Sequence, residues 1–585
     1  METIFKKPKL KKQTSRNAFD VSQKRVYHVP FGAILPCYMR VLSPDDFIEL
    51  STENQFICDD LSRPAFMRLK EHINFYAVPI KQIWSVFDNF ITGQDNYNSS
   101  AVEYFNEQSG LIPTTLPSVE AASFTAKLRD LSNSVDIFSF NKCANALRLL
   151  DTLEYGNLYG WYLKFSQNGV LGQDAPNVDL GQPNVLALAA YQKIYYDYFR
   201  NPKYEACDVK AYNFDDYNGT SPITGDRLGK LLEMHYAWAK KDYFTSVNPS
   251  VLPTTYDIGF TSLSSTAPNT DIFGVPGSAP TNVIGREGSV VIGGNVQNNG
   301  QFVYQSASDF PQSNVSALRF AFAYDKLLRR MREAGGTFDA QMLAQFGITP
   351  PEGRDGKCVY IGGQTNRLNA SDVINTGEQD DLGFIGGNIN QYSTPRGKFK
   401  YHAKEFCIVL GVYHTSLDYD YPSYSTSRFN RYRSRFDFFN PAFENLGLQA
   451  LYKFELLNLT YDAGETDYLP EDIEASNKLL GYQRRYAEYK TSVDKVFGLF
   501  DFNLNVDYAK WVSQFRPLRA GDEIGPSEPI DVAPISRVFL QYNPAQFSQL
   551  VNVQYNGFWN TDPFKVHQYV HAKVISNMSP YSEVW

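Results

Sequence analysis

The 585-residue sequence has few of the features that mark exported, membrane-spanning or disulfide-bonded proteins. Its six cysteines are scattered without a C-x-x-C pair, which is typical of free thiols in a reducing compartment. The basic first residues are not followed by the apolar run of a secretory signal. Residues 406–413, among the most apolar stretches, are far too few to span a bilayer. We therefore expect a soluble product of the cytosol, without membrane insertion.

Motifs of catalysis and metal binding are also scarce. Residues 353–357 resemble a phosphate-binding loop only faintly, because the glycine spacing is wrong and no Ser or Thr follows the lysine. His567 and His571 have a metal-ligand spacing only on a helix, whereas their surroundings predict the polar face of a strand. Asp418 and Asp420 could share a divalent cation, but we favour a solvated strand edge as their explanation. The sequence therefore predicts no enzyme, no metal and no cofactor.

Aromatic side chains, in contrast, are abundant. The chain has 42 Phe and 39 Tyr, while charged residues make up only 20%. Rings in this number exceed what one core normally absorbs, and they indicate wide ring-lined contacts between subunits or with a ligand. Residues 480–489 mix tyrosines with charges of both signs, a combination favoured where protein surfaces dock. We predict subunit contacts at Tyr482, Arg485, Tyr486 and Tyr489.

Four arginines form a dense cationic cluster further upstream: Arg428, Arg431, Arg433 and Arg435. On a strand, the last three side chains would project on one side. Phosphate contact is one interpretation. We favour pairing with the acidic surface of a second subunit, because the guanidinium fork suits carboxylates in interfaces.

The charge distribution is uneven. Residues 1–16 carry a net charge of +5, although the whole chain carries −8. A basic arm on an acidic body is typical of a protein that contacts nucleic acid locally, and a solvated tail that aids solubility is the alternative. The cations that we expect to contact nucleic acid are Lys6, Lys7, Lys9, Lys11, Lys12 and Arg16.

Periodicity predicts both strands and helices. Residues 67–78 and 564–574 alternate apolar and polar side chains with period two, so we expect half-buried strands that are widely separated along the chain. Such remote strands suggest a β-sandwich with large insertions. Helices are predicted over residues 141–153, 185–200 and 318–331. Long loops are predicted at 101–140 and, more strongly, at 247–312.

An ordered set of short blocks carries a family resemblance. The blocks are residues 19–25, 32–36, 41–45, 75–79, 83–84, 90–93, 191–194, 197–200, 241–245, 318–337, 346–347, 360–363, 372–376, 435–441 and 481–489. Together they resemble the major capsid proteins of the microviruses, small single-stranded DNA phages, in their gokushovirus-like branch. Departures are small: Arg484 stands where a carboxylate is common, and Glu333-Ala334 stand where a small and then a basic residue are expected.

The resemblance implies a mainly β protein with the viral jelly roll, eight antiparallel strands in two facing sheets with long loop and helical insertions. Residues 1–16 would be a basic arm, and residues 17–585 a single jelly-roll domain. Copies would form a T=1 icosahedral shell around circular single-stranded DNA. The resemblance also implies a surface protrusion near the threefold axes, for which 247–312 is our first candidate and 101–140 our second.

The implied partners are other copies of the chain, the single-stranded DNA genome, minor capsid (pilot) and scaffolding proteins, and a host surface receptor. The chain would be made in the bacterial host cytoplasm and end in the virion. A carbohydrate-binding or carbohydrate-cleaving β-sandwich is the alternative, since it would also be rich in Tyr and Phe. A tail fibre is disfavoured, because the sequence has no internal repeat.

Overall fold

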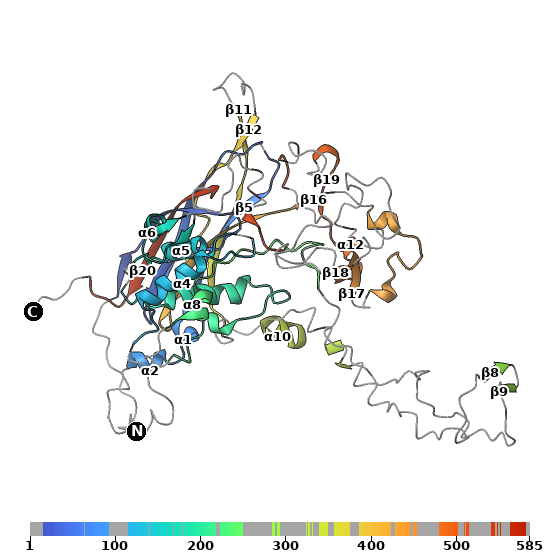
Figure 1. Cartoon of the computed structure of the whole chain (residues 1–585), viewed down its shortest axis with the longest axis horizontal. Coiled ribbons are helices and arrows are strands. Elements are labelled where there is room, and N and C mark those ends of the chain that lie inside the picture. Colours follow the sequence, from blue (N-terminus) through green and yellow to red (C-terminus); the bar gives the residue numbers. More distant parts are fainter. Residues whose placement is uncertain are drawn as a thin grey trace, which may run out of the picture. The chain divides into compact units, whose positions relative to one another are not determined.

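A computed structural model describes residues 16–92, 115–249, 338–348, 356–374, 385–452, 479–500 and 562–580, apart from short interruptions, together with isolated stretches such as 283–292 and 508–513 (Figure 1). The chain divides into two compact units. The larger consists of residues 1–249 and 349–585, and the smaller of residues 250–348.

The larger unit contains two antiparallel sheets. In the first, named here the β20 sheet, β4 (Phe47–Cys58) and β20 (Phe564–Ser576) are paired at the centre. Two short strands pair in succession along each of them, so the sheet is four strands wide. These short strands are β1 (Asn17–Asp20) and β2 (Gln23–Val29) on β20, and β13 (Asn390–Ser393) and β14 (Phe399–His402) on β4.

The second sheet, the β15 sheet, has the strand order β10-β5-β15-β3. Its strands are β3 (Leu35–Leu42), β5 (Leu69–Pro79), β10 (Val359–Leu368) and β15 (Cys407–Leu417). The inner faces of the two sheets meet in one core: the Tyr27 ring of β2 packs edge-on against Tyr413 of β15, with centroids 5.9 Å apart. The fold is thus a mainly β, antiparallel jelly-roll sandwich, as predicted.

The predicted period-two strands are confirmed as β5 and β20. Along β20, Phe564, Val566, Gln568, Val570, Ala572 and Val574 are buried, and the alternate residues from Lys565 to Lys573 face outward. Two inward positions are polar. Glu71 of β5 accepts hydrogen bonds from Asn54 across the core, from Asn366 at 2.7 Å and from Tyr413 at 3.2 Å, whereas Gln568 of β20 donates to Thr52 at 3.1 Å. Burial raises the pKa of Glu71 despite these donors.

Helices fill the long connection between β5 and β10. They are α1 (Ile80–Ile83), α2 (Phe87–Thr92), α4 (Ala121–Ser132), α5 (Lys142–Thr152), α6 (Tyr159–Phe165), α7 (Leu186–Ile194), the π-helical turn η2 (Tyr195–Phe199), the 3-10 turn η3 (Val209–Ala211) and α8 (Gly225–Leu231). The short hairpin β6 (Ser166–Gln167) and β7 (Val170–Leu171) lies among them. Helix α7 packs on β5 and β15, and α5 packs on β3. The helices therefore cover the β15 sheet.

Two of the three helix predictions are confirmed. Helix α5 begins where expected, because the Asn141 side chain accepts from the backbone N–H groups of Cys143 and Ala144. Helix α7 continues into η2 and ends at Arg200, ahead of Pro202. The helix predicted over 318–331 lies mostly outside the described residues, although residues 323, 324, 326, 327 and 330 are helical.

The loop predicted at 101–140 is wrong in its described part. Residues 121–132 form α4, whose Phe124 and Leu128 are buried against the other helices. Its charged residues Lys127, Arg129 and Asp130 are at least partly exposed, so the local composition resembles that of a loop. The region 247–312 lies largely outside the described residues. In the smaller unit, the described elements are the hairpin β8 (Val283–Arg286) with β9 (Ser289–Ile292) and helix α10 (Phe338–Phe346).

The remaining elements of the larger unit are short. A ribbon of β11 (Ser371–Ile374) and β12 (Ile385–Asn388) follows β10, and β16 (Asp420–Pro422) pairs in parallel with β19 (Asp494–Val496). Residues 427–452 and 479–490, called the aromatic lobe below, contain η4 (Arg428–Arg431), η5 (Pro441–Phe443), β17 (Leu448–Tyr452), β18 (Leu479–Arg484) and α12 (Ala487–Lys490). The 3-10 turn η7 (Gly498–Phe500) follows β19. Among the described helices, none has the length and apolarity needed to cross a membrane.

Candidate functional site

The aromatic lobe exposes a cluster of rings. Tyr489 lies near its centre, with ring centroids 5.1 Å from Phe429, 6.2 Å from Phe439 and 6.4 Å from Tyr432. About half of each of five large side chains is open to solvent: Phe429, Phe436, Phe438, Phe439 and Tyr489. A contiguous exposed surface of this kind marks a protein–protein contact.

Tyr486, in the interior of the lobe, holds the segments that carry these rings through hydrogen bonds. Tyr486 is buried and has a left-handed conformation, with φ of 60°. Its N–H donates to Oε1 of Gln449 at 3.1 Å, and its hydroxyl accepts from the N–H of Asn440 at 3.3 Å. Tyr486 therefore lies in the interior of the lobe. It could affect a contact with a second subunit only by positioning the exposed residues around it.

The arginine cluster does not form the strand on which Arg431, Arg433 and Arg435 would project together. Residues 428–431 form η4, and the chain then turns because the Asp437 carboxylate accepts from the N–H groups of Arg433 and Ser434 at 2.9 and 2.7 Å. Arg433 and Arg435 are nevertheless exposed, and the Arg435 guanidinium lies 4.8 Å from the Phe436 ring centroid. The exposed surface therefore combines rings with cations.

Arg428 has a different environment from its neighbours. Its guanidinium lies 3.2 Å from Glu455, 3.6 Å from Glu488 and 3.4 Å from the hydroxyl of Tyr243. Burial raises the pKa of Glu455 although Arg428 opposes the shift. Arg428 therefore stabilises the lobe from within.

Residues 481–483 anchor the lobe to the body of the larger unit. Tyr482 and Asn248 exchange two backbone hydrogen bonds of 2.8 Å, and the Gln483 amide donates to Ser246 at 2.9 Å and to the carbonyl of Tyr243. Gly481 has φ of 155°, and a Cβ there would overlap Val247. This tyrosine-rich stretch therefore serves first as an internal anchor, which its composition alone did not reveal.

The predicted contact residues thus fall into three groups. Arg433, Arg435 and Tyr489 are exposed; Arg428, Tyr482 and Arg485 are half-buried; Tyr486 is buried. The side chain of Arg431 and the arm residues Lys6, Lys7, Lys9, Lys11 and Lys12 lie outside the described residues. Arg16 is described, and it donates to the Asp45 carbonyl at 2.6 Å.

Sequence reasoning missed the phenylalanines as contact residues. Phe436, Phe438 and Phe439 stand in the run 435–441, which entered only as a block of the resemblance. Two features of the sequence could have indicated an exposed surface here. Large apolar residues stand beside arginines, and their two-residue spacing does not continue along the chain as it would in a buried strand.

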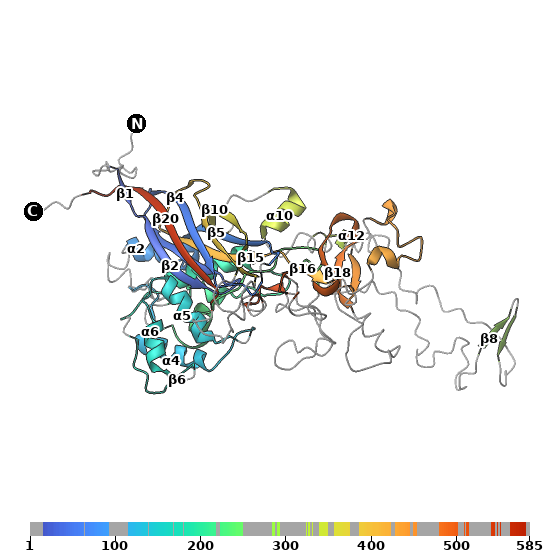
Figure 2. The same ribbon diagram turned by 90° about the horizontal axis from the view of Figure 1, so that it is seen from above.

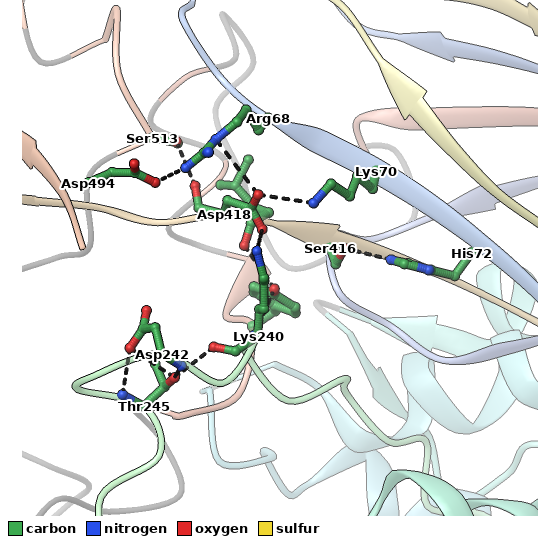
Figure 3. Close-up of polar contacts among 12 residues, drawn as sticks. Arg68, Lys70, His72, Lys240, Asp242, Thr245, Ser416, Asp418, Asp494 and Ser513 are labelled. Carbon is green, nitrogen blue, oxygen red and sulfur yellow. Dashed lines mark hydrogen bonds and ion pairs between the residues drawn. The ribbon is translucent and has the colours of Figure 1, made fainter. Parts of the chain in front are cut away.

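An ionic cluster at the end of the β15 sheet includes Asp494 of β19 (Figure 3). Asp418 lies 3.0 Å from Lys70, 3.5 Å from Lys240 and 3.7 Å from Arg68, and Arg68 also pairs with Asp494. Although burial alone would raise the pKa of Asp418, these cations hold it below its usual value. The cluster borders a polar cavity of about 210 Å³.

The two aspartates that could have shared a cation have separate partners. Asp420 accepts from the N–H and hydroxyl of Ser513 at 3.1 and 2.9 Å, whereas Asp418 is surrounded by basic side chains. No group of three or more metal-binding side chains occurs among the described residues. His567 and His571 lie on the outer side of β20, as predicted. The fold and the exposed lobe define a structural protein that acts through contact surfaces.

Comparisons with known proteins identify the family. The family model described as capsid protein (F protein) matches residues 9–127 and 173–520, so the chain belongs to this family. It is similar to three proteins named capsid protein VP1: from Chlamydia phage 1 (24% identical), Bdellovibrio phage phiMH2K (22%) and Spiroplasma virus 4 (23%).

The extent of these matches varies. They cover 36, 85 and 54% of this chain, and 35, 85 and 60% of the respective relatives. The chain therefore spans about a third of the first relative's length and most of the second's. The family supports a structural capsid protein of a microvirus, in place of the carbohydrate-active alternative.

Proposed function

We propose that copies of this chain assemble through the aromatic lobe into a T=1 icosahedral shell around circular single-stranded DNA, without catalysing a reaction. The exposed rings beside Arg433 and Arg435 carry the proposal, because aromatic and arginine side chains dominate the energetics of protein interfaces. A shell subunit needs several non-equivalent contacts whose rotations close. Membership of a capsid family supports the same conclusion.

Further parts of the proposal concern the other partners. Residues 1–16 contact the genome with up to six cations, and residues 247–312 form a surface protrusion near the threefold axes, with 101–140 as the second candidate. Minor capsid (pilot) and scaffolding proteins assist assembly, and a host receptor binds the finished particle. Synthesis takes place in the bacterial cytoplasm. The family resemblance supports these parts of the proposal.

Substitution of the exposed rings tests the lobe contact. The double variant Phe436→Ser/Phe438→Ser should keep its fold but fail to form particles, because both side chains are more than half exposed. Leu163→Ser on α6 is a matched control, since Leu163 is 55% exposed and lies outside the lobe. Electron microscopy of purified material measures particle number and symmetry. Normal particles from the double variant would exclude the lobe as an essential contact.

Deletion of residues 1–16 tests the genome contact. Particles should still form, but retain less DNA, because the arm supplies up to six phosphate contacts. Each neutralised phosphate of a single strand contributes about −0.7 to the slope of log K for DNA binding against log salt concentration (the salt slope), or roughly −4 for six cations. The DNA is extracted from nuclease-treated particles and assayed with exonuclease and with single-strand-specific nuclease. Unchanged DNA content would refute the role of the arm, and duplex or linear DNA would refute the genome type.

A further inference from the structure

Among the described residues, no helix covers the outer face of the β20 sheet as helices cover the β15 sheet. In the described part of the chain, helices α5 and α7 pack on the β15 sheet. The helical layer reaches the β20 sheet at its β2 edge, where Arg25 donates to the Thr152 carbonyl at 2.7 Å and pairs with Glu154. Figure 2 shows β2, β20 and β4 side by side, with α4, α5 and α6 below them in the view.

The outward side chains of the central strand form an ordered row. Because alternate residues of a strand share a face, this row is Lys565, His567, Tyr569, His571 and Lys573, two lysines flanking three rings. Successive members are about 6.8 Å apart along the strand, so the row is roughly 27 Å long. This row takes no part in the contacts of the aromatic lobe described above.

Neighbouring strands continue the same chemistry. In the register of β2 with β20, Lys24 is opposite Tyr569 and Val26, 68% exposed, is opposite His567. On β4, Gln55 is opposite His567 and Glu53 is opposite Tyr569. The Tyr569 and His571 rings meet edge to face at 4.5 Å. The face thus presents rings, an amide and cations on adjacent strands, opposite one another in the register.

Several of these groups are available for a ligand. Lys24 and Lys573 are exposed and make no ion pair within the described residues. Carboxylates engage two other members of the row: Lys565 pairs with Asp59, and His571 lies 3.6 Å from Glu53. Glu53 also accepts from the Tyr392 hydroxyl at 2.6 Å, which places a further exposed ring on this face. Asp20 of β1 and Glu49 of β4 are opposite Lys573 in the register, but Glu49 pairs with Lys398 and Lys400. Lys24 and Lys573 therefore keep their charge for an anionic ligand.

We propose that this face of the β20 sheet binds single-stranded DNA along β20, with bases stacked on Tyr569 and the histidines and phosphates held by Lys24 and Lys573. Open sheet faces with exposed rings bind unpaired bases by stacking, because every base has a π face, and lysines track the phosphates without reading sequence. The inference rests on the proposed genome contact and adds a second, ring-dependent surface to the basic arm.

Binding measurements on the full-length chain test this proposal. The probe is a fluorescent oligothymidine, compared with a duplex of equal length over a series of salt concentrations. Lys24→Gln/Lys573→Gln should reduce the magnitude of the salt slope by about 1.4, from two phosphate contacts at about 0.7 each. Tyr569→Ala should weaken binding roughly 5- to 100-fold without changing the slope, and Tyr569→Phe should restore it.

Matched controls separate this surface from general charge and from the arm. Lys164→Gln/Lys210→Gln removes two exposed lysines from the helical region and should leave binding unchanged. All variants keep residues 1–16, and thermal melting confirms their folding. The wild-type chain should also bind the duplex more weakly than the single strand, because paired bases cannot stack on the sheet.

The outcomes distinguish this inference from the proposed function. Face variants that bind like the wild type, while deletion of residues 1–16 weakens binding, would overturn the inference and leave the genome contact intact. A wild-type chain without affinity for the single strand would overturn both. Face variants that keep DNA affinity but no longer form particles would identify a second copy of the chain as the occupant, and would also overturn the inference.

Discussion

The imidazole rings of His72 and His414 stack with centroids 4.7 Å apart and 12° between their planes. They come from the neighbouring strands β5 and β15, where the two residues are directly opposite. His72 is hydrogen bonded to Thr365 at 3.0 Å and to Ser416 at 2.7 Å, and Phe199 of η2 packs edge-on over His414 at 5.3 Å. Lys70 and Asp418 are the charged groups that act on the pair.

This pair predicts a loss of stability in acid. Desolvation, aided by Lys70 and opposed by Asp418, lowers the pKa of His72 to about 4, and desolvation with the neighbouring His72 lowers that of His414 well below its usual value. Because both pKa values are depressed in the fold, the unfolded chain binds protons first, and stability falls as the pH drops from about 6.5 towards 4. His72 alone accounts for up to about 3 kcal/mol.

Urea unfolding at several pH values measures this effect. His72→Gln keeps a hydrogen-bonding side chain but cannot gain charge, so its stability should fall less steeply in acid. His402→Gln is the control, because His402 is half exposed and bonds Asp45 at 3.0 Å. An unchanged pH dependence in His72→Gln would contradict the assignment.

A buried ion pair ties helix α5 to the residues just before β20. Arg148 of α5 donates to both carboxylate oxygens of Asp562 at 3.0 and 2.8 Å, and both side chains are at most 1% exposed. Arg148→Met should destabilise the fold by about 3–5 kcal/mol, because it leaves a buried carboxylate without its partner. The double variant Arg148→Met/Asp562→Leu should lose much less. Equal losses in denaturant melts would show that packing, not charge, holds this contact.

The conformation at Gly481 predicts a strong requirement for glycine. Gly481→Ala would force a Cβ into Val247 and to about 2.7 Å from the Asn248 carbonyl, at a φ of 155° that L-residues rarely adopt. We expect a loss of roughly 2–4 kcal/mol and faster amide exchange across β17 and β18. Gly160→Ala, where a Cβ meets nothing within 4 Å, is the control. Unaltered exchange in the lobe would refute the anchoring role.

The ionic cluster predicts unequal costs for its members. Arg68→Gln should cost no more than about 1 kcal/mol, because Arg68 and Asp494 are both substantially exposed. Asp418→Asn should cost about 2 kcal/mol more, since Asp418 is only 10% exposed and its loss leaves Lys70, Lys240 and Arg68 repelling each other. Raised salt should narrow the difference. Equal costs for the two variants at low salt would contradict this ranking.

The sequence predicted what local periodicity controls. Strands β5 and β20 have long alternating patterns, and α5 has both an apolar stripe and a capping Asn141. Prediction failed where distant residues decide the conformation. The arginine cluster turns because of Asp437, and residues 481–483 are fixed by a strand-like contact with Asn248, which lies far away in sequence. The same holds for His72, which alternation places on a strand but cannot place beside His414.

The pairing of β1 with β20 joins Asn17 to Ser576, and β20 also supplies the middle of its sheet. A nascent chain that has emerged only as far as the helices therefore has one sheet without its central member, and its apolar inner face stays open. Closing so large a loop is slow, and it delays completion of the sandwich until translation has passed residue 576. Ribosomes that stop early would release subunits whose β20 sheet lacks this strand.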